Sequence, residues 1–124
     1  MPARLRPLSP AALAEVLDRL DSGATGGAAA APDDLRAAVK HFLAVLVSRH
    51  PGKSVEVRVP PFAAVQCVEG ARHTRGTPPA VVETDPHTWL EIARGAVSFH
   101  DAREAGRIRA SGERSDLSAL LPLT

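Results

Sequence analysis

Residues 55–68, with the sequence VEVRVPPFAAVQCV, decide the fold. The first five of them alternate valine with a charged residue, which is typical of a strand with one buried face. Pro60-Pro61 removes two backbone donors and predicts a turn or a break in the strand. The small and β-branched residues from Phe62 to Val68 then predict a second strand that is more buried than the first.

A strong helical pattern precedes these strands. It begins at Pro32-Asp33-Asp34, where two carboxylates stabilise the positive end of the helix dipole. It ends at Pro51-Gly52, a pair that stops helices. Between them, large apolar residues recur at helical spacing and predict one wide buried face.

A first, shorter helix is predicted upstream. Ser9-Pro10 supplies a cap and a favoured first residue, and the apolar stripe ends near Asp21-Ser22-Gly23. Residues 23–31 are rich in glycine and alanine and are interpreted as a linker. We therefore divide the chain into residues 1–31, a helix plus linker, and residues 32–124, the main domain.

Strands and helices also follow the deciding stretch. Gly70 to Pro79 is predicted to be a loop that joins a hairpin, because it holds two glycines and two prolines. Asp85-Pro86 and Ser98 have the residue types that start helices. The predicted elements are a strand at 80–83, helices at 86–94 and 99–105, a strand at 107–111 and a last helix at 116–123. Four strands mixed with helices in this order indicate an α+β fold.

Composition excludes several classes of protein. The chain has 124 residues, a length typical of one domain, and its formal net charge is +1. That balance and the presence of only one tryptophan and three phenylalanines argue against nucleic-acid binding. No apolar run is long enough to span a membrane, and Met1–Pro10 lacks the apolar stretch of a secretory signal. A single cysteine, Cys67, fits a cytoplasmic location.

The segment from Thr84 to Leu123 carries a recognisable series of motifs. They are Thr84-Asp85-Pro86-x-x-Trp89-Leu90, Gly95, Ala102-x-x-x-Gly106-Arg107-Ile108-x-x-Ser111-Gly112-Glu113 and Leu117-x-x-Leu120-Leu121. This series resembles the C-terminal half of the sterol carrier protein type 2 superfamily. The longer stretch from Val55 to Leu123 resembles its short actinobacterial branch, often called bacterial sterol carrier orthologues. Glu113 departs from the pattern, since the family usually has aspartate there.

The resemblance implies an α+β fold with a mainly antiparallel, twisted sheet of about five strands and helices packed on one face. It also implies a non-enzymatic module that holds an apolar or acyl ligand, such as a lipid or fatty acid, between helices and sheet. The residues expected to line this space are Phe42, Leu46, Val57, Phe62, Val65, Trp89, Ile92, Phe99, Ile108, Leu120 and Leu121. The same residues also suit a filled core, in which case the chain is a structural or protein-interaction domain that binds a partner or a second copy.

One polar stretch is a candidate for binding an anionic head group. Arg72, His73 and Arg75 lie in the predicted loop, where arginine forks suit a carboxylate or phosphate. The alternative is a surface loop held by salt bridges to nearby acidic residues. The five histidines lack metal-binding spacing, so neither a metal nor another cofactor is expected. No nucleophile–base pair is expected either, because Cys67 is interpreted as a small buried hydrophobe.

Overall fold

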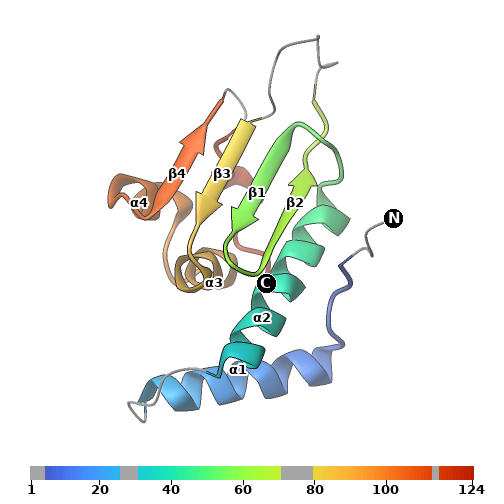
Figure 1. Ribbon diagram of the computed structural model, residues 1–124, viewed down its shortest axis with the longest axis vertical. Helices are drawn as coiled ribbons and strands as arrows, with labels where there is room; N and C mark the ends of the chain where they lie inside the picture. The colour runs from blue at the N-terminus through green and yellow to red at the C-terminus, as the bar shows by residue number, and fades with distance from the viewer. Residues whose placement is uncertain (1–4, 26–30, 71–79, 113–114) are drawn as a thin grey trace.

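The computed structural model describes residues 5–25, 31–70, 80–112 and 115–124, and of residues 23–25 it describes only the backbone. Its elements in chain order are α1 (Pro10–Thr25), α2 (Pro32–Arg49), β1 (Val55–Val59), β2 (Ala63–Cys67), β3 (Ala80–Thr84), α3 (Pro86–Arg94), α4 (Phe99–Glu104), β4 (Ile108–Ser111) and a 3-10 turn η1 (Ser118–Leu120). Figure 1 shows the strands side by side, with α3 behind them and α1 below the sheet. The α+β class predicted from the sequence is confirmed.

The described residues form one sheet of four strands in the order β2-β1-β3-β4. The β1–β2 and β3–β4 pairs are antiparallel, but β1 and β3 are parallel, with Val55 opposite Ala80. The sheet is therefore mixed, whereas the family resemblance led us to expect about five mainly antiparallel strands. The four strands expected from the pattern are all present, but the expectation that the second is more buried than the first is wrong: β1 buries three valines, whereas β2 buries only Cys67 because it lies at the edge of the sheet.

The connection between β2 and β3 explains the parallel pair. β2 ends beside the start of β1, because Cys67 is opposite Val55. β3 also starts beside Val55, but on the other side of β1. β2 and β3 therefore lie on opposite sides of β1, and β3 runs in the same direction as β1. The expectation that residues 70–79 join a hairpin is wrong for this reason.

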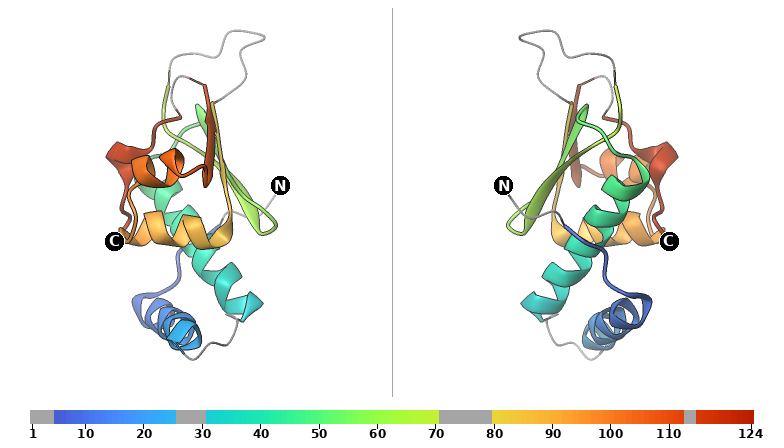
Figure 2. Two further views of the ribbon diagram at one scale, coloured as in Figure 1. Left: turned by 90° about the vertical axis from the view of Figure 1, so that its left-hand side faces the viewer. Right: turned by 90° about the vertical axis from the view of Figure 1, so that its right-hand side faces the viewer.

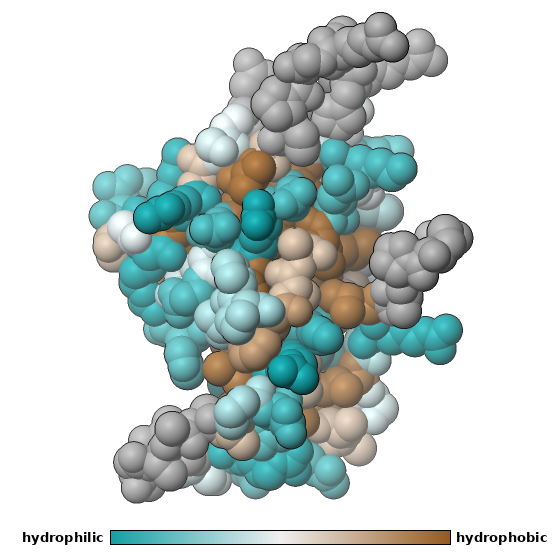
Figure 3. Space-filling view, viewed as in Figure 1, coloured by the Kyte–Doolittle hydropathy of each residue, from teal (hydrophilic) through white to brown (hydrophobic). Residues whose placement is uncertain are grey.

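Alternation along the strands separates a buried face from an open one. The three valines of β1 are 0% exposed and face the helices, as do Ala80 and Val82 of β3. Glu56, Arg58 and Glu83 lie on the opposite face, where the Arg58 Nε is 3.6 Å from a carboxylate oxygen of each glutamate. Figure 2 shows α2, α3 and α4 on one side of the sheet only, as the family resemblance implied. Figure 3 looks onto the other side, where hydrophobic residues gather toward β2 and α2.

Caps hold the short helices in place. The Asp85 carboxylate accepts from the Thr88 N–H at the start of α3, and Gly95 ends the helix with φ of 85°. The Ser98 hydroxyl accepts from the Asp101 N–H at the start of α4. These caps confirm the sequence prediction.

Two helix ends differ from the prediction. α1 continues to Thr25, beyond the expected end near Gly23. The predicted last helix is reduced to the single turn of η1. Leu121 precedes Pro122 and takes an extended conformation, φ −112° and ψ 149°, because a following proline disfavours the helical region.

Candidate functional site

The space between helices and sheet is occupied by one apolar cluster. Seven of the eleven predicted lining residues lie within it and are at most 5% exposed. They come from five elements, so the fold brings together positions that are far apart in the chain. These residues are Phe42 and Leu46 of α2, Val57 of β1, Trp89 and Ile92 of α3, Phe99 of α4 and Ile108 of β4.

The other four predicted residues lie at the rim of this cluster. Phe62 and Val65, at and after the β1–β2 turn, are half-buried, and so are Leu120 and Leu121 near the C-terminus. The guanidinium of Arg36, on α2, lies 5.7 Å from the centre of the Phe62 ring. Because they are half-buried, these four can contact both the core and a molecule arriving from solvent.

Trp89 connects the two largest helices of the layer. Its side chain is 0% exposed, and its indole N–H donates to the Val39 carbonyl of α2 at 3.2 Å. The indole therefore has the partner that a buried N–H requires. Among the described residues, no buried side-chain nitrogen or oxygen lacks a hydrogen bond. The buried polar side-chain atoms of the described residues are therefore all engaged within the protein.

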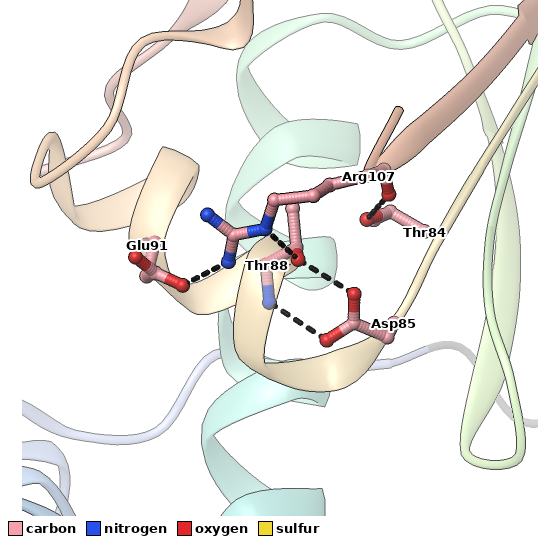
Figure 4. A network of polar contacts seen from close by, with 5 residues as sticks. All are labelled: Thr84, Asp85, Thr88, Glu91 and Arg107. Carbon is pink, nitrogen blue, oxygen red and sulfur yellow. Dashed lines mark hydrogen bonds and ion pairs between the residues drawn. The ribbon is translucent and has the colours of Figure 1, made fainter. Parts of the chain in front are cut away.

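A polar network connects α3 to the start of β4 (Figure 4). The Thr88 hydroxyl donates to Asp85 Oδ1 at 2.6 Å and accepts from Arg107 Nε at 3.1 Å. Arg107 also forms an ion pair with Glu91, and its carbonyl accepts from the Thr84 hydroxyl at 2.9 Å. Thr88 is only 1% exposed, so the network is partly sheltered from water.

This network holds the Asp85 carboxyl in its charged form. Burial by itself raises the pKa of Asp85, but hydrogen bonds from Thr88 and the nearby Arg107 outweigh it and leave the pKa below its ordinary value. The sequence indicated the Asp85 cap but not the contacts of Arg107 with Thr88 and Glu91. Arg107 precedes β4 and bonds to α3. A basic residue next to Ile108 gives no local signal of such a distant partner.

His41 is the buried titratable residue on α2. Its side chain is 7% exposed, its ring lies edge-on to Phe42, and its Nδ1 accepts from the Leu8 N–H at 2.9 Å. An accepting Nδ1 carries no proton. Burial lowers the pKa of His41, which favours that neutral form.

The remaining groups considered from the sequence are Cys67, the histidines and the basic stretch at residues 72–75. Cys67 is 0% exposed as predicted, and burial raises the pKa of its thiol to about 11. A thiol in that state is a weak nucleophile. No group of three or more metal-ligating side chains occurs in the described part of the chain. Arg72, His73 and Arg75 lie outside the described residues.

Comparison with protein families shows to which family this chain belongs. The family described as bacterial SCP ortholog matches residues 32–123, from the start of α2 to the C-terminal segment. The chain belongs to the bacterial SCP ortholog family. The resemblance inferred from the motifs is thereby confirmed, and the match extends upstream to include α2. A comparison with curated proteins gives no match.

The residues matched by the family include most of the apolar cluster. All eleven predicted lining residues fall between residues 32 and 123, whereas α1 falls outside. No helix in the described ranges has the length and apolarity to cross a membrane.

Proposed function

We propose that the protein is a non-enzymatic module that binds an apolar or acyl ligand between its helical layer and its sheet. The supporting observation is that the predicted lining residues gather in one cluster within the family unit. Apolar surface removed from water contributes about 25 cal/mol per Å². A fatty acyl chain can therefore bind through burial alone, without a polar anchor. The cytoplasmic location expected from the single cysteine is part of this proposal.

Ligand contacts are assigned first to the half-buried rim residues. Phe62, Val65, Leu120 and Leu121 pack against the core and still reach the surface. An acyl chain in contact with them can reach inward to Trp89 and Ile92. Arg72, His73 and Arg75 are proposed to meet an acidic head group, since arginine pairs well with carboxylates.

The first test identifies what the purified protein carries. Native mass spectrometry, followed by solvent extraction, should reveal a bound mass of a few hundred daltons that is a lipid or an acyl acid. Delipidated protein should then bind long-chain fatty acids, measured by calorimetry. Protein that is empty and binds neither fatty acids nor sterols would contradict the proposal.

A matched pair of variants tests the site itself. Val65→Thr places a hydroxyl on the proposed lining with little change in volume. Val47→Thr makes the same change on α2, at another half-buried valine that packs against the core. An unpaired hydroxyl costs about 1–3 kcal/mol in an apolar site, so Val65→Thr should weaken fatty-acid binding by roughly fivefold or more. Val47→Thr should leave the affinity unchanged, and equal effects would show that β2 does not contact the ligand.

A protein-interaction domain with a filled core is the second candidate. The burial of seven proposed lining residues to 5% exposure or less favours it, because such residues also make an ordinary core. In that case the empty protein would bind a protein partner or form a homodimer. Light scattering on delipidated protein measures directly whether a homodimer forms.

A further inference from the structure

Helix α1 is held to the rest of the molecule by little buried surface. Only Val16 and Leu20 of its described side chains are buried, at 7% and 8% exposure. Leu13 and Leu17 are half-buried beside them. In contrast, α2 buries seven residues. Figure 1 shows α1 lying across the end of α2 that is farther from β2, and Figure 2 shows the same arrangement from the sides.

Two ion pairs connect α1 to both large helices of the layer. Arg19 donates through two nitrogens to the Asp34 carboxylate on α2, each at 2.9 Å. On α3, Arg94 donates through two nitrogens to the Asp21 carboxylate of α1, each at 3.0 Å. α1 therefore bridges α2 and α3, the two helices that are joined by the Trp89–Val39 hydrogen bond.

These fastenings are individually weak. One side chain of each pair is largely exposed, Arg19 at 55% and Asp21 at 58%, and ion pairs at the surface stabilise a fold only weakly because water and salt screen them. The segment before α1 adds the hydrogen bond from Leu8 to His41. The sheet and α2, whose buried side chains form the main core, must be the more stable part. Weakly packed elements open locally while the body stays folded.

We propose that α1 is a movable cover on the apolar interior, which undocks from α2 and α3 as a unit while the sheet and α2 stay folded. Undocking removes Val16 and Leu20 from the core cluster and exposes the apolar surface beneath them. We infer that the exposed surface admits the apolar ligand, and this part of the inference rests on the proposed function. The undocking itself does not depend on any ligand.

Hydrogen exchange on the full chain tests the undocking. Arg94→Gln and Arg19→Gln each remove one ion pair and keep most of the side-chain stem. Arg58→Gln is the matched control, since Arg58 is 52% exposed and pairs with two glutamates on the open sheet face. We expect α1 amides to exchange faster than those of β1 in the wild type. Each of the first two variants should accelerate α1 exchange by roughly two- to fivefold without changing β1, and Arg58→Gln should not affect α1.

Uptake of a fluorescent long-chain fatty acid tests the covering role. If α1 admits the ligand by undocking, Arg94→Gln and Arg19→Gln should raise the association rate by the same factor as the exchange rate. α1 amides protected as strongly as those of β1, or unaffected by either variant, would overturn the inference. So would unchanged uptake rates in variants whose α1 exchanges faster. A wild type that binds no fatty acid would contradict the proposed function, and the exchange comparison alone would then decide whether α1 undocks.

Discussion

The protonation state of His41 decides whether its ring can hold the segment before α1. Its Nδ1 can accept from Leu8 only while it carries no proton, and burial lowers its pKa below the ordinary 6.5. Between the lowered value and 6.5, the unfolded chain binds the proton more readily than the folded one. The contribution of His41 to stability is therefore complete above the unfolded pKa and is lost as the pH falls through the folded pKa.

Substitution of His41 isolates this contribution. His41→Gln keeps an acceptor for Leu8 but does not titrate. We expect the free energy of unfolding of the wild type to fall more than that of the variant between about pH 7.5 and about pH 5. Urea unfolding at both pH values measures the difference. Parallel falls in the two proteins would mean that His41 is protonated equally in the folded and unfolded states.

Thr88 supplies the hydroxyl on which the polar network depends. Thr88→Val keeps the volume but removes the donor to Asp85 and the acceptor for Arg107. Leaving these groups without that partner should cost about 1–3 kcal/mol of unfolding free energy, and the pKa of Asp85 should rise. Thr88→Ser retains the hydroxyl and should keep the pKa of Asp85 low. Urea unfolding and NMR titration of Asp85 check the two effects, and identical titrations in both variants would contradict the assigned bonds.

At the scale of elements, the turn after α2 determines where the β1–β2 pair lies. The Val68 N–H donates to the His50 carbonyl at 2.7 Å, and the Ser54 N–H donates to the Val68 carbonyl at 3.0 Å. Gly52 lies so close to Val68 that a Cβ would stand 2.1 Å from its carbonyl carbon and oxygen. The end of α2 is therefore fastened directly to the residue after β2.

Two glycines make a matched test of this close approach. Gly52 and Gly106 have positive φ values, +150° and +76°, but a Cβ on Gly106 would meet nothing within 4 Å. Gly106→Ala should cost only the backbone term, about 1–2 kcal/mol. Gly52→Ala must also move backbone and should cost more than about 4 kcal/mol. Denaturant unfolding compares them, and equal losses would mean that the turn relaxes easily.

At the scale of the whole molecule, the division into residues 1–31 and 32–124 remains a prediction. The second part contains all four strands and three α-helices, so we expect it to fold alone. Without Val16 and Leu20 it should melt at a lower temperature and bind more of a dye specific for exposed apolar surface. Circular dichroism and dye fluorescence on residues 32–124 measure both. An unfolded fragment would show that α1 is an obligatory part of the core.

Much of the local structure could be predicted from the sequence. Several features involve only residues close together in the chain. They are the alternation of Val55–Val59, the acidic start and Pro-Gly end of α2, and the Asp85 and Ser98 caps. Spacing and cap chemistry are sufficient there, because they determine backbone angles and the buried face locally. The proposed lining set was also chosen from this periodicity and the family motifs, and its contact with a ligand remains a prediction.

Tertiary structure decided the arrangements that join distant residues. The parallel β1–β3 pair, the Arg94–Asp21 bond across 73 positions and the attachment of Arg107 to α3 have no counterpart in local spacing. A strand pattern shows which face is buried but not which neighbour it pairs with, and an arginine pattern does not show which carboxylate it reaches. Those choices depend on how the apolar faces pack together, which settles only when the whole chain is folded.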